Sequence, residues 1–205
     1  MQRLAEQNIN TAKEYERIFF DRRIKGVDDF DLRRWRTLLK KYKGGKLIDL
    51  GTLDSLVPIM AKGMYPRSEV WGLDQAAEAI KQMQEQYRQI YYKVGDVYQT
   101  GFKDEEFNYI VMGEVLEHLE NPELAILEAM RILKVGGTLA ISVPFDEAKE
   151  PGAVDKDRHI WSFTKEDFEE ILKPFGKLRL EVLRSFQKPV YRYCWPQLLI
   201  WVTKK

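Results

Sequence analysis

The chain has 205 residues, of which 44% are hydrophobic and 32% are charged. This balance is typical of a globular domain and excludes a wholly disordered chain. The 33 basic and 32 acidic side chains give a formal net charge of +1, which does not support a large nucleic-acid-binding surface. The single cysteine, Cys194, excludes an internal disulfide framework and a zinc site built from cysteines.

The first residues lack the apolar segment of a signal peptide, and no apolar run approaches the roughly 20 residues that span a bilayer. We therefore expect a cytoplasmic protein that does not associate with membranes.

The first 43 residues are rich in charge, and apolar side chains recur in them at helical spacing. Asp28-Asp29 is expected to cap the second of two helices, and Gly44-Gly45 ends the block. We expect residues 1–43 to form a helical lid or extension on a domain that spans residues 44–205.

From Lys46 onwards, short apolar runs alternate with helical stretches. This alternation predicts a doubly wound, mostly parallel sheet with helices on both faces. The last two strand-like segments are close enough to pair as an antiparallel couple. The expected strands are 47–50, 70–74, 90–94, 107–112, 138–143, about 177–185 and about 190–203; the expected helices of this domain are 56–62, 76–87, 122–133 and one that ends at Lys173 after a capping box at 164–167.

Three of the strand candidates end in an acid or run into one, at Asp49, Asp74 and Asp96. Ligands of open α/β sheets bind outside the carboxyl ends of the strands. Three carboxylates at that edge suit a ligand with hydroxyl and amine donors and a positive centre, and they suit a bare pyrophosphate poorly. The alternative is that they are solvated loop acids.

These strand ends resemble the ordered motifs of the class I S-adenosylmethionine-dependent methyltransferases. Leu47-Ile48-Asp49-Leu50-Gly51 is similar to the first motif, Val70 to Asp74 to the second and Gly95-Asp96-Val97 to the third. The segment from Phe107 to Leu119 resembles the fourth, and Leu133 to Leu139 resembles the approach to the fifth strand. The resemblance covers about 46–203 and implies a seven-stranded Rossmann-like sheet with an antiparallel C-terminal strand.

The resemblance implies S-adenosylmethionine as cofactor and S-adenosylhomocysteine as product. Asp74 would accept hydrogen bonds from the ribose hydroxyls, and Asp96 with Val97 would meet the adenine. Asp49 and the turn at Gly51 would lie under the methionine part. The full set of expected cofactor-binding residues is Asp49, Gly51, Thr52, Leu53, Asp74, Gln75, Asp96, Val97, Gly113 and Glu114.

Leu53 and Ser55 stand where the family usually has glycines. Glycine at such positions permits positive φ and a close approach of the backbone to a ligand. Two readings stay open: a rearranged loop that still binds the cofactor, or a chain that keeps the fold as a non-catalytic interaction protein.

The two histidines, His118 and His159, are the candidate catalytic residues, because a neutral imidazole can take a proton from an acceptor. Each could instead serve only in packing or capping. The cofactor carries an activated methyl group, so the protein mainly aligns the reactants. Glu117 is expected to face solvent or cap a helix, and no metal site is expected.

We expect a small-molecule acceptor and a monomer or homodimer. A nicotinamide oxidoreductase is disfavoured, because the first strand is not followed by G-x-G-x-x-G. A nucleic-acid methyltransferase is disfavoured by the net charge and by Gly113-Glu114-Val115-Leu116 after the fourth strand. The basic run around Arg33-Arg34 is expected to be a solvated helix face, and the alternating aromatic residues near the C-terminus are expected to pack in the core. These aromatic residues are Tyr191, Tyr193, Trp195 and Trp201.

Overall fold

The computed structural model describes residues 1–3, 10–16, 29–53, 55–145, 159–184 and 196–205. The predictions for Cys194, for the aromatic residues within 191–195 and for most of the polar loop after residue 145 lie outside these ranges.

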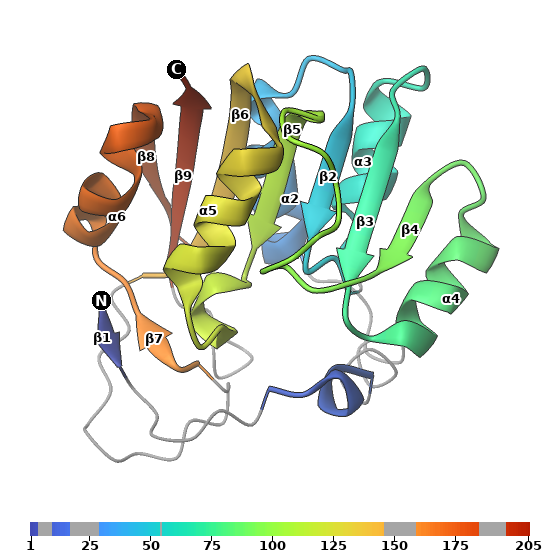
Figure 1. The fold of residues 1–205 in the computed structure, drawn as a ribbon, viewed down its shortest axis with the longest axis horizontal. Helices are drawn as coiled ribbons and strands as arrows, with labels where there is room; N and C mark the ends of the chain where they lie inside the picture. The colour runs from blue at the N-terminus through green and yellow to red at the C-terminus, as the bar shows by residue number, and fades with distance from the viewer. Residues whose placement is uncertain (4–9, 17–28, 54, 146–158, 185–195) are drawn as a thin grey trace.

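A seven-stranded sheet forms the centre of the molecule, in the order β4-β3-β2-β5-β6-β9-β8 (Figure 1). Its first five strands in the chain are mutually parallel, and β9 lies antiparallel between β6 and β8. The predicted fold class is therefore confirmed. The strands are β2 (Leu47–Leu50), β3 (Val70–Asp74), β4 (Tyr91–Val94), β5 (Phe107–Gly113), β6 (Leu133–Pro144), β8 (Gly176–Leu183) and β9 (Gln197–Lys204).

The chain builds the sheet outward from β2 to β4 and then returns to place β5 on the other side of β2. This reversal makes a topological switch point between β2 and β5, where open α/β sheets bind their ligands. The carboxyl ends of the parallel strands meet at one edge, which is the lower edge in Figure 1.

Helices cover both faces of the sheet (Figure 1). Helices α2 and α3 pack on one face with Leu47 and Val111, whereas α5 packs on the other with Ile48 and Leu50. Alternate residues of a strand point to opposite faces, which explains why neighbours in β2 belong to different clusters. The helices are α2 (Asp29–Leu38), α3 (Val57–Met64), α4 (Ala77–Gln86), α5 (Pro122–Ile132) and α6 (Lys165–Leu172), with short 3₁₀ turns at η1 (Leu39–Lys41), η2 (Leu116–His118) and η3 (Lys173–Phe175).

Helix α2 is anchored in the core of the domain. Trp35 and Leu38 are buried, and the Leu38 carbonyl accepts hydrogen bonds from the Tyr109 hydroxyl and the Trp201 indole, at 2.6 and 3.2 Å. These bonds satisfy a carbonyl that the end of the helix would leave unpaired. The expected core position of Trp201 is confirmed.

Two local predictions at element ends have different outcomes. The capping box before α6 is confirmed, because Thr164 and Asp167 exchange side-chain and backbone hydrogen bonds. The strand expected at 138–143 starts earlier than predicted: α5 ends at Ile132, and β6 begins at Leu133, which pairs with Phe107. Tertiary pairing thus extends the strand over Gly136 and Gly137.

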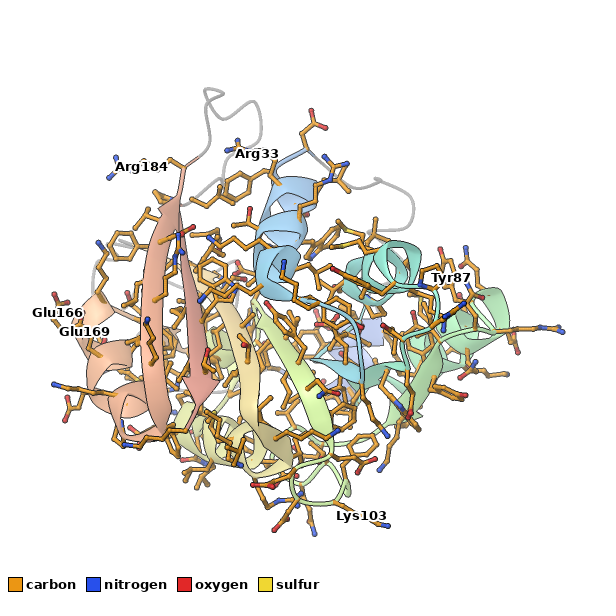
Figure 2. All side chains as sticks on the ribbon, turned by 90° about the horizontal axis from the view of Figure 1, so that it is seen from above. Arg33, Tyr87, Lys103, Glu166, Glu169 and Arg184 are labelled. Carbon is orange, nitrogen blue, oxygen red and sulfur yellow. The ribbon has the colours of Figure 1, made fainter. Side chains whose placement is uncertain are left out.

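Charged side chains outside the layers point away from the body of the molecule, as Figure 2 shows for Lys103, Glu166 and Glu169. None of the helices in the described ranges is both long and apolar enough to cross a bilayer.

Candidate active site

Asp74 ends β3 and is 7% exposed. Its Oδ2 accepts a hydrogen bond from the Leu53 backbone N–H and its Oδ1 accepts one from Ala76, both at 2.9 Å. These two backbone donors fix the orientation of both carboxyl oxygens at the end of β3.

The turn after β2 wraps around this carboxylate. Gly51 has a φ of +73°, and the N–H groups of Gly51 and Thr52 both donate to the Leu73 carbonyl, at 2.8 and 3.0 Å. A methyl group at Gly51 would stand 2.6 Å from a methyl carbon of Val115. The turn therefore requires glycine at this position for both its backbone conformation and its space.

Leu53 takes up a backbone conformation that usually belongs to glycine, with a φ of +30°. Its side chain is buried in a cluster with Ala76, Ala79 and Met83. Burial in this apolar cluster offsets the cost of the conformation, and its N–H is the donor to Asp74. The altered position in the first motif is therefore part of the packing between the turn and α4.

Asp49 lies in β2, one residue before its carboxyl end, and is 2% exposed. It accepts a hydrogen bond of 2.9 Å from the Thr52 hydroxyl. Burial raises the pKa of Asp49 to about 7, and the neighbouring Asp74 carboxylate adds to this rise. Hydrogen bonds from Thr52 and Ser55 and the charge of Arg34 oppose it. A cationic ligand beside Asp49 would favour its ionised form.

Asp96 lies two residues beyond β4, whose last residue pairs with Asp74. It is exposed, and its Oδ1 accepts the Tyr98 N–H at 2.8 Å, which closes a turn. Val97 is half-buried against the core, and Gln75 is exposed. The structure thus brings the third acid to the same edge as Asp74, in a more solvated position.

Gly113 and Glu114 follow at the end of β5. Glu114 has a φ of +57°, another left-handed conformation in a residue other than glycine. Its carboxylate accepts the Ser142 hydroxyl at 2.9 Å and pairs with the Arg34 guanidinium at 3.0 Å. Strained backbone held by such contacts is frequent at functional sites.

Arg34 is a site residue that the sequence analysis missed. The expectation of a solvated basic face is wrong for it, because Arg34 is 6% exposed and pairs with both Glu114 and Asp31. Arg34 lies next to Trp35 and four residues before Leu38, which places it beside the apolar side of α2. This spacing is the sequence signal that could have indicated its burial.

Glu117, His118 and His159 form a compact group just beyond β5. The rings of His118 and His159 lie 4.9 Å apart, and His118 Nε2 is 4.0 Å from Glu117 Oε1. Two hydrogen bonds hold the segment of His159 against η2: Ile160 N–H donates to the Glu117 carbonyl at 2.6 Å, and the Trp161 indole donates to the Leu119 carbonyl at 2.8 Å.

The expectation that Glu117 faces solvent or caps a helix is wrong. Its side chain is fully buried, and neither carboxyl oxygen has a hydrogen-bond partner among the residues that the structure describes. Burial, and then the nearby charge of Glu114, raises the pKa of Glu117 well above its ordinary value. A buried polar group without a partner is costly, so this one calls for an explanation.

Residues 10–16 lie across this edge. The Tyr15 ring packs against the Leu53 cluster and meets the His118 ring edge-on at 6.1 Å. The Asn10 amide donates to the His118 carbonyl at 3.1 Å, and β1 (Gln2–Arg3) pairs with β7 (Trp161–Ser162). Part of the predicted N-terminal extension therefore contacts both the first-motif turn and the histidines.

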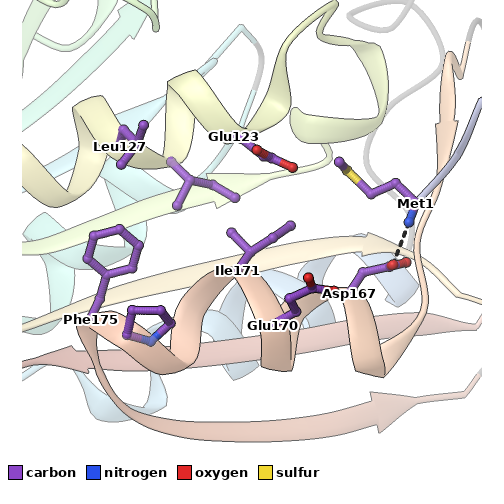
Figure 3. A pocket seen from close by; sticks show the side chains of 9 residues that line it. Met1, Glu123, Leu127, Asp167, Glu170, Ile171 and Phe175 are labelled. Atoms are coloured by element: carbon purple, nitrogen blue, oxygen red, sulfur yellow. Dashed lines mark hydrogen bonds and ion pairs between the residues drawn. The ribbon is translucent and has the colours of Figure 1, made fainter.

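A separate groove of about 370 Å³ lies between α5 and α6 (Figure 3). It is lined by apolar side chains such as Ile126 and Phe175, and the Met1 amino group pairs with Asp167 at its end. None of the strand-end residues lines it, so we assign it no part in the site.

A first prediction concerns the turn: Gly51→Ala should lower the free energy of unfolding by about 2–4 kcal/mol. The change imposes a left-handed φ on alanine and a clash with the stiff Val115 side chain. Urea unfolding would measure it. Gly63→Ala in α3 is the matched control, because a methyl group there meets nothing within 4 Å and should slightly stabilise the helix. Equal stability of the two variants would contradict this account of the turn.

Comparisons with known proteins agree with this geometry. Residues 48–141 match the family described as Methyltransferase domain. The chain is 30% identical to the mitochondrial ubiquinone biosynthesis O-methyltransferase of Rattus norvegicus over 67% of this chain and 45% of that protein. It is 25% identical to the demethylmenaquinone methyltransferase of Bacillus pumilus, over 96% and 82% respectively. In general the chain spans about half the length of the curated relatives it matches.

Solved structures share the fold. A chain from the complex of the Haloferax volcanii Trm112 methyltransferase activator with a methyltransferase aligns with a TM-score of 0.74 at 16% identity, covering 94% of this chain and 98% of that one. A SAM-dependent methyltransferase from Thermotoga maritima aligns with a TM-score of 0.69 at 20% identity, covering 94% and 96%. Residues 48–141 therefore match a methyltransferase domain, and the chain has the fold of S-adenosylmethionine-dependent methyltransferases.

Proposed function

We propose that this chain transfers a methyl group from S-adenosylmethionine to a small-molecule acceptor. The observation that carries the proposal is the cluster at the ends of β2 and β3, where the turn from Gly51 to Leu53 holds the Asp74 carboxylate beside Asp49. The acids of this cluster offer acceptors and negative charge, which match a ligand with a ribose diol and a positively charged amino acid part.

The cofactor supplies an activated methyl group when bound, and the chain's own residues bind and orient it. Asp74 would accept the two ribose hydroxyls, and Asp96 with Val97 would hold the adenine. Asp49 and the turn at Gly51 would hold the methionine part. Thr52, Leu53, Gln75, Gly113 and Glu114 complete the proposed cofactor-binding set.

The acceptor would lie beyond β5, next to His118 and His159. The two imidazoles are half-buried or buried and contact each other, so they are placed to interact with the reacting group of an acceptor. Residues 10–16 would form part of the wall of this region, which agrees with the expected role of the N-terminal extension.

The test is turnover with a panel of small acceptors that bear phenol, alcohol, amine, thiol or carboxylate groups. We expect S-adenosylhomocysteine to form only when one class of acceptor is present, as measured by mass spectrometry, and not with Asp74→Asn. Intact cofactor binding without turnover on any acceptor would point to a non-catalytic binding protein. Loss of both would support the interaction-protein alternative.

A further inference from the structure

We propose that Glu117, His118 and His159 form a binding site for a divalent transition-metal ion. One ligand atom from each of the three residues lies within 4.8 Å of the other two. Two imidazoles and one carboxylate are a ligand set that zinc, manganese and non-haem iron sites use, with open positions left for water or substrate. This proposal departs from the expectation of no metal site. The sequence does not show that η2 and the segment around residue 159 lie together, because they are far apart in the chain.

The buried carboxylate of Glu117 is the independent observation that points to an ion. It is 0% exposed, and both of its oxygens are without a hydrogen-bond partner in the described ranges. Exposed acidic groups commonly gather without a bound ion, whereas the Glu117 carboxyl group is buried. A cation bound here would supply the partner that this carboxyl group otherwise lacks.

The backbone around the group is already fixed. The Ile160 and Trp161 hydrogen bonds to η2 set His159 against His118, and Asn10 binds the His118 carbonyl. The 4.0 Å between His118 Nε2 and Glu117 Oε1 is longer than the separation of two ligands bound at about 2.1 Å to one ion. The ligand atoms would therefore have to approach one another by about 1 Å, a distance that side-chain rotation can supply.

The site also suggests a class of acceptor, and this second part rests on the proposed function. An ion with open positions would bind a hydroxyl of the acceptor and lower its pKa, so that its proton leaves to solvent. The oxygen lone pair then forms the bond to the methyl carbon. The carbon–sulfur bond breaks, and its electron pair stays on the sulfur of S-adenosylhomocysteine. We therefore infer a hydroxyl-bearing acceptor.

The test is equilibrium dialysis of the purified, chelator-treated full chain against Zn²⁺, with Co²⁺ absorption in the visible range as a spectroscopic signature. We expect one bound ion per chain. Glu117→Gln should weaken Zn²⁺ binding at least about a hundredfold, and His159→Asn should do the same. Glu123→Gln, an exposed neighbour on α5, is the matched control and should bind like the unmodified chain.

Glu117→Gln should fold, since its carboxyl group makes no hydrogen bond to lose, and its melting temperature without metal should equal or exceed that of the unmodified chain. Absence of stoichiometric Zn²⁺ and Co²⁺ binding by the folded unmodified chain would overturn the site, as would equal binding by Glu117→Gln. S-adenosylhomocysteine binding is measured in the same metal-free samples. If S-adenosylhomocysteine binds and Zn²⁺ does not, the metal site fails and the proposed function stands. If Zn²⁺ binds but turnover occurs only on acceptors without hydroxyls, the acceptor class is wrong and the metal site stands.

Discussion

Asp74→Asn should abolish most cofactor binding while leaving the fold intact. The change removes the negative charge that would accept two ribose hydroxyls and puts an amide N–H₂ against either the Leu53 or the Ala76 N–H donor. Each charge-assisted hydrogen bond contributes about 1.5–3 kcal/mol, so an affinity loss of about a hundredfold or more is expected.

Thermal unfolding measures this loss. S-adenosylhomocysteine at a hundredfold excess over its Kd should stabilise the unmodified chain by about 2.7 kcal/mol, or about 5–10 °C in Tm. The same concentration should shift Asp74→Asn by about 1 °C. Glu85→Gln, an exposed acid on α4, is the control and should respond like the unmodified chain. A full Tm shift in folded Asp74→Asn would remove Asp74 from the site.

The affinity for S-adenosylhomocysteine should rise with pH up to about 7, where Asp49 ionises. In the free protein the buried carboxyl group is protonated below this pH, and binding the positively charged amino group of the ligand requires its ionised form. The affinity should therefore rise by up to about tenfold per pH unit below 7 and level off above it. Calorimetric titrations between about pH 5 and 8 would measure this profile.

The same carboxyl group should make the free protein less stable as the pH rises. The pKa of Asp49 is about 7 in the folded chain and 3.8 in the unfolded chain. Between these two pH values the folded chain therefore binds more protons than the unfolded chain. The free energy of unfolding should fall across that interval, by up to about 4 kcal/mol. Asp49→Asn should remove this dependence, be more stable than the unmodified chain near pH 8, and lose the pH dependence of binding. A flat binding profile in the unmodified chain would contradict the role of Asp49.

The sheet could be predicted from the sequence because its strands are short, apolar and separated by clear helical stretches. The candidate site could be predicted in part, because Asp49 and Asp74 lie near or at the carboxyl ends of their strands, Asp96 follows β4, and parallel strands share a carboxyl edge. The start of β6 could not be predicted, because the pairing of Leu133 with Phe107 extends the strand over Gly136 and Gly137.

The parts of the site that could not be predicted depend on contacts between distant segments. Arg34 looked like a member of a solvated basic run, but it pairs with Glu114, 80 residues further along the chain. Glu117 looked like an exposed acid, but the segment that carries His159 packs against η2. Leu53 stands where the family usually has glycine, and its side chain packs with residues of α4. The spacing of Arg34 from Leu38 indicates only the side of α2 on which it lies, and none of these contacts between distant segments can be predicted from periodicity.

Calorimetric titration of the unmodified chain with S-adenosylhomocysteine near pH 8 tests the central claim most directly. The account predicts saturable binding of one molecule per chain at the edge formed by β2, β3 and β4. Absence of binding by a folded chain would show that the turn around Leu53 has closed the Asp74 carboxylate to the cofactor, and it would contradict the proposed methyl transfer.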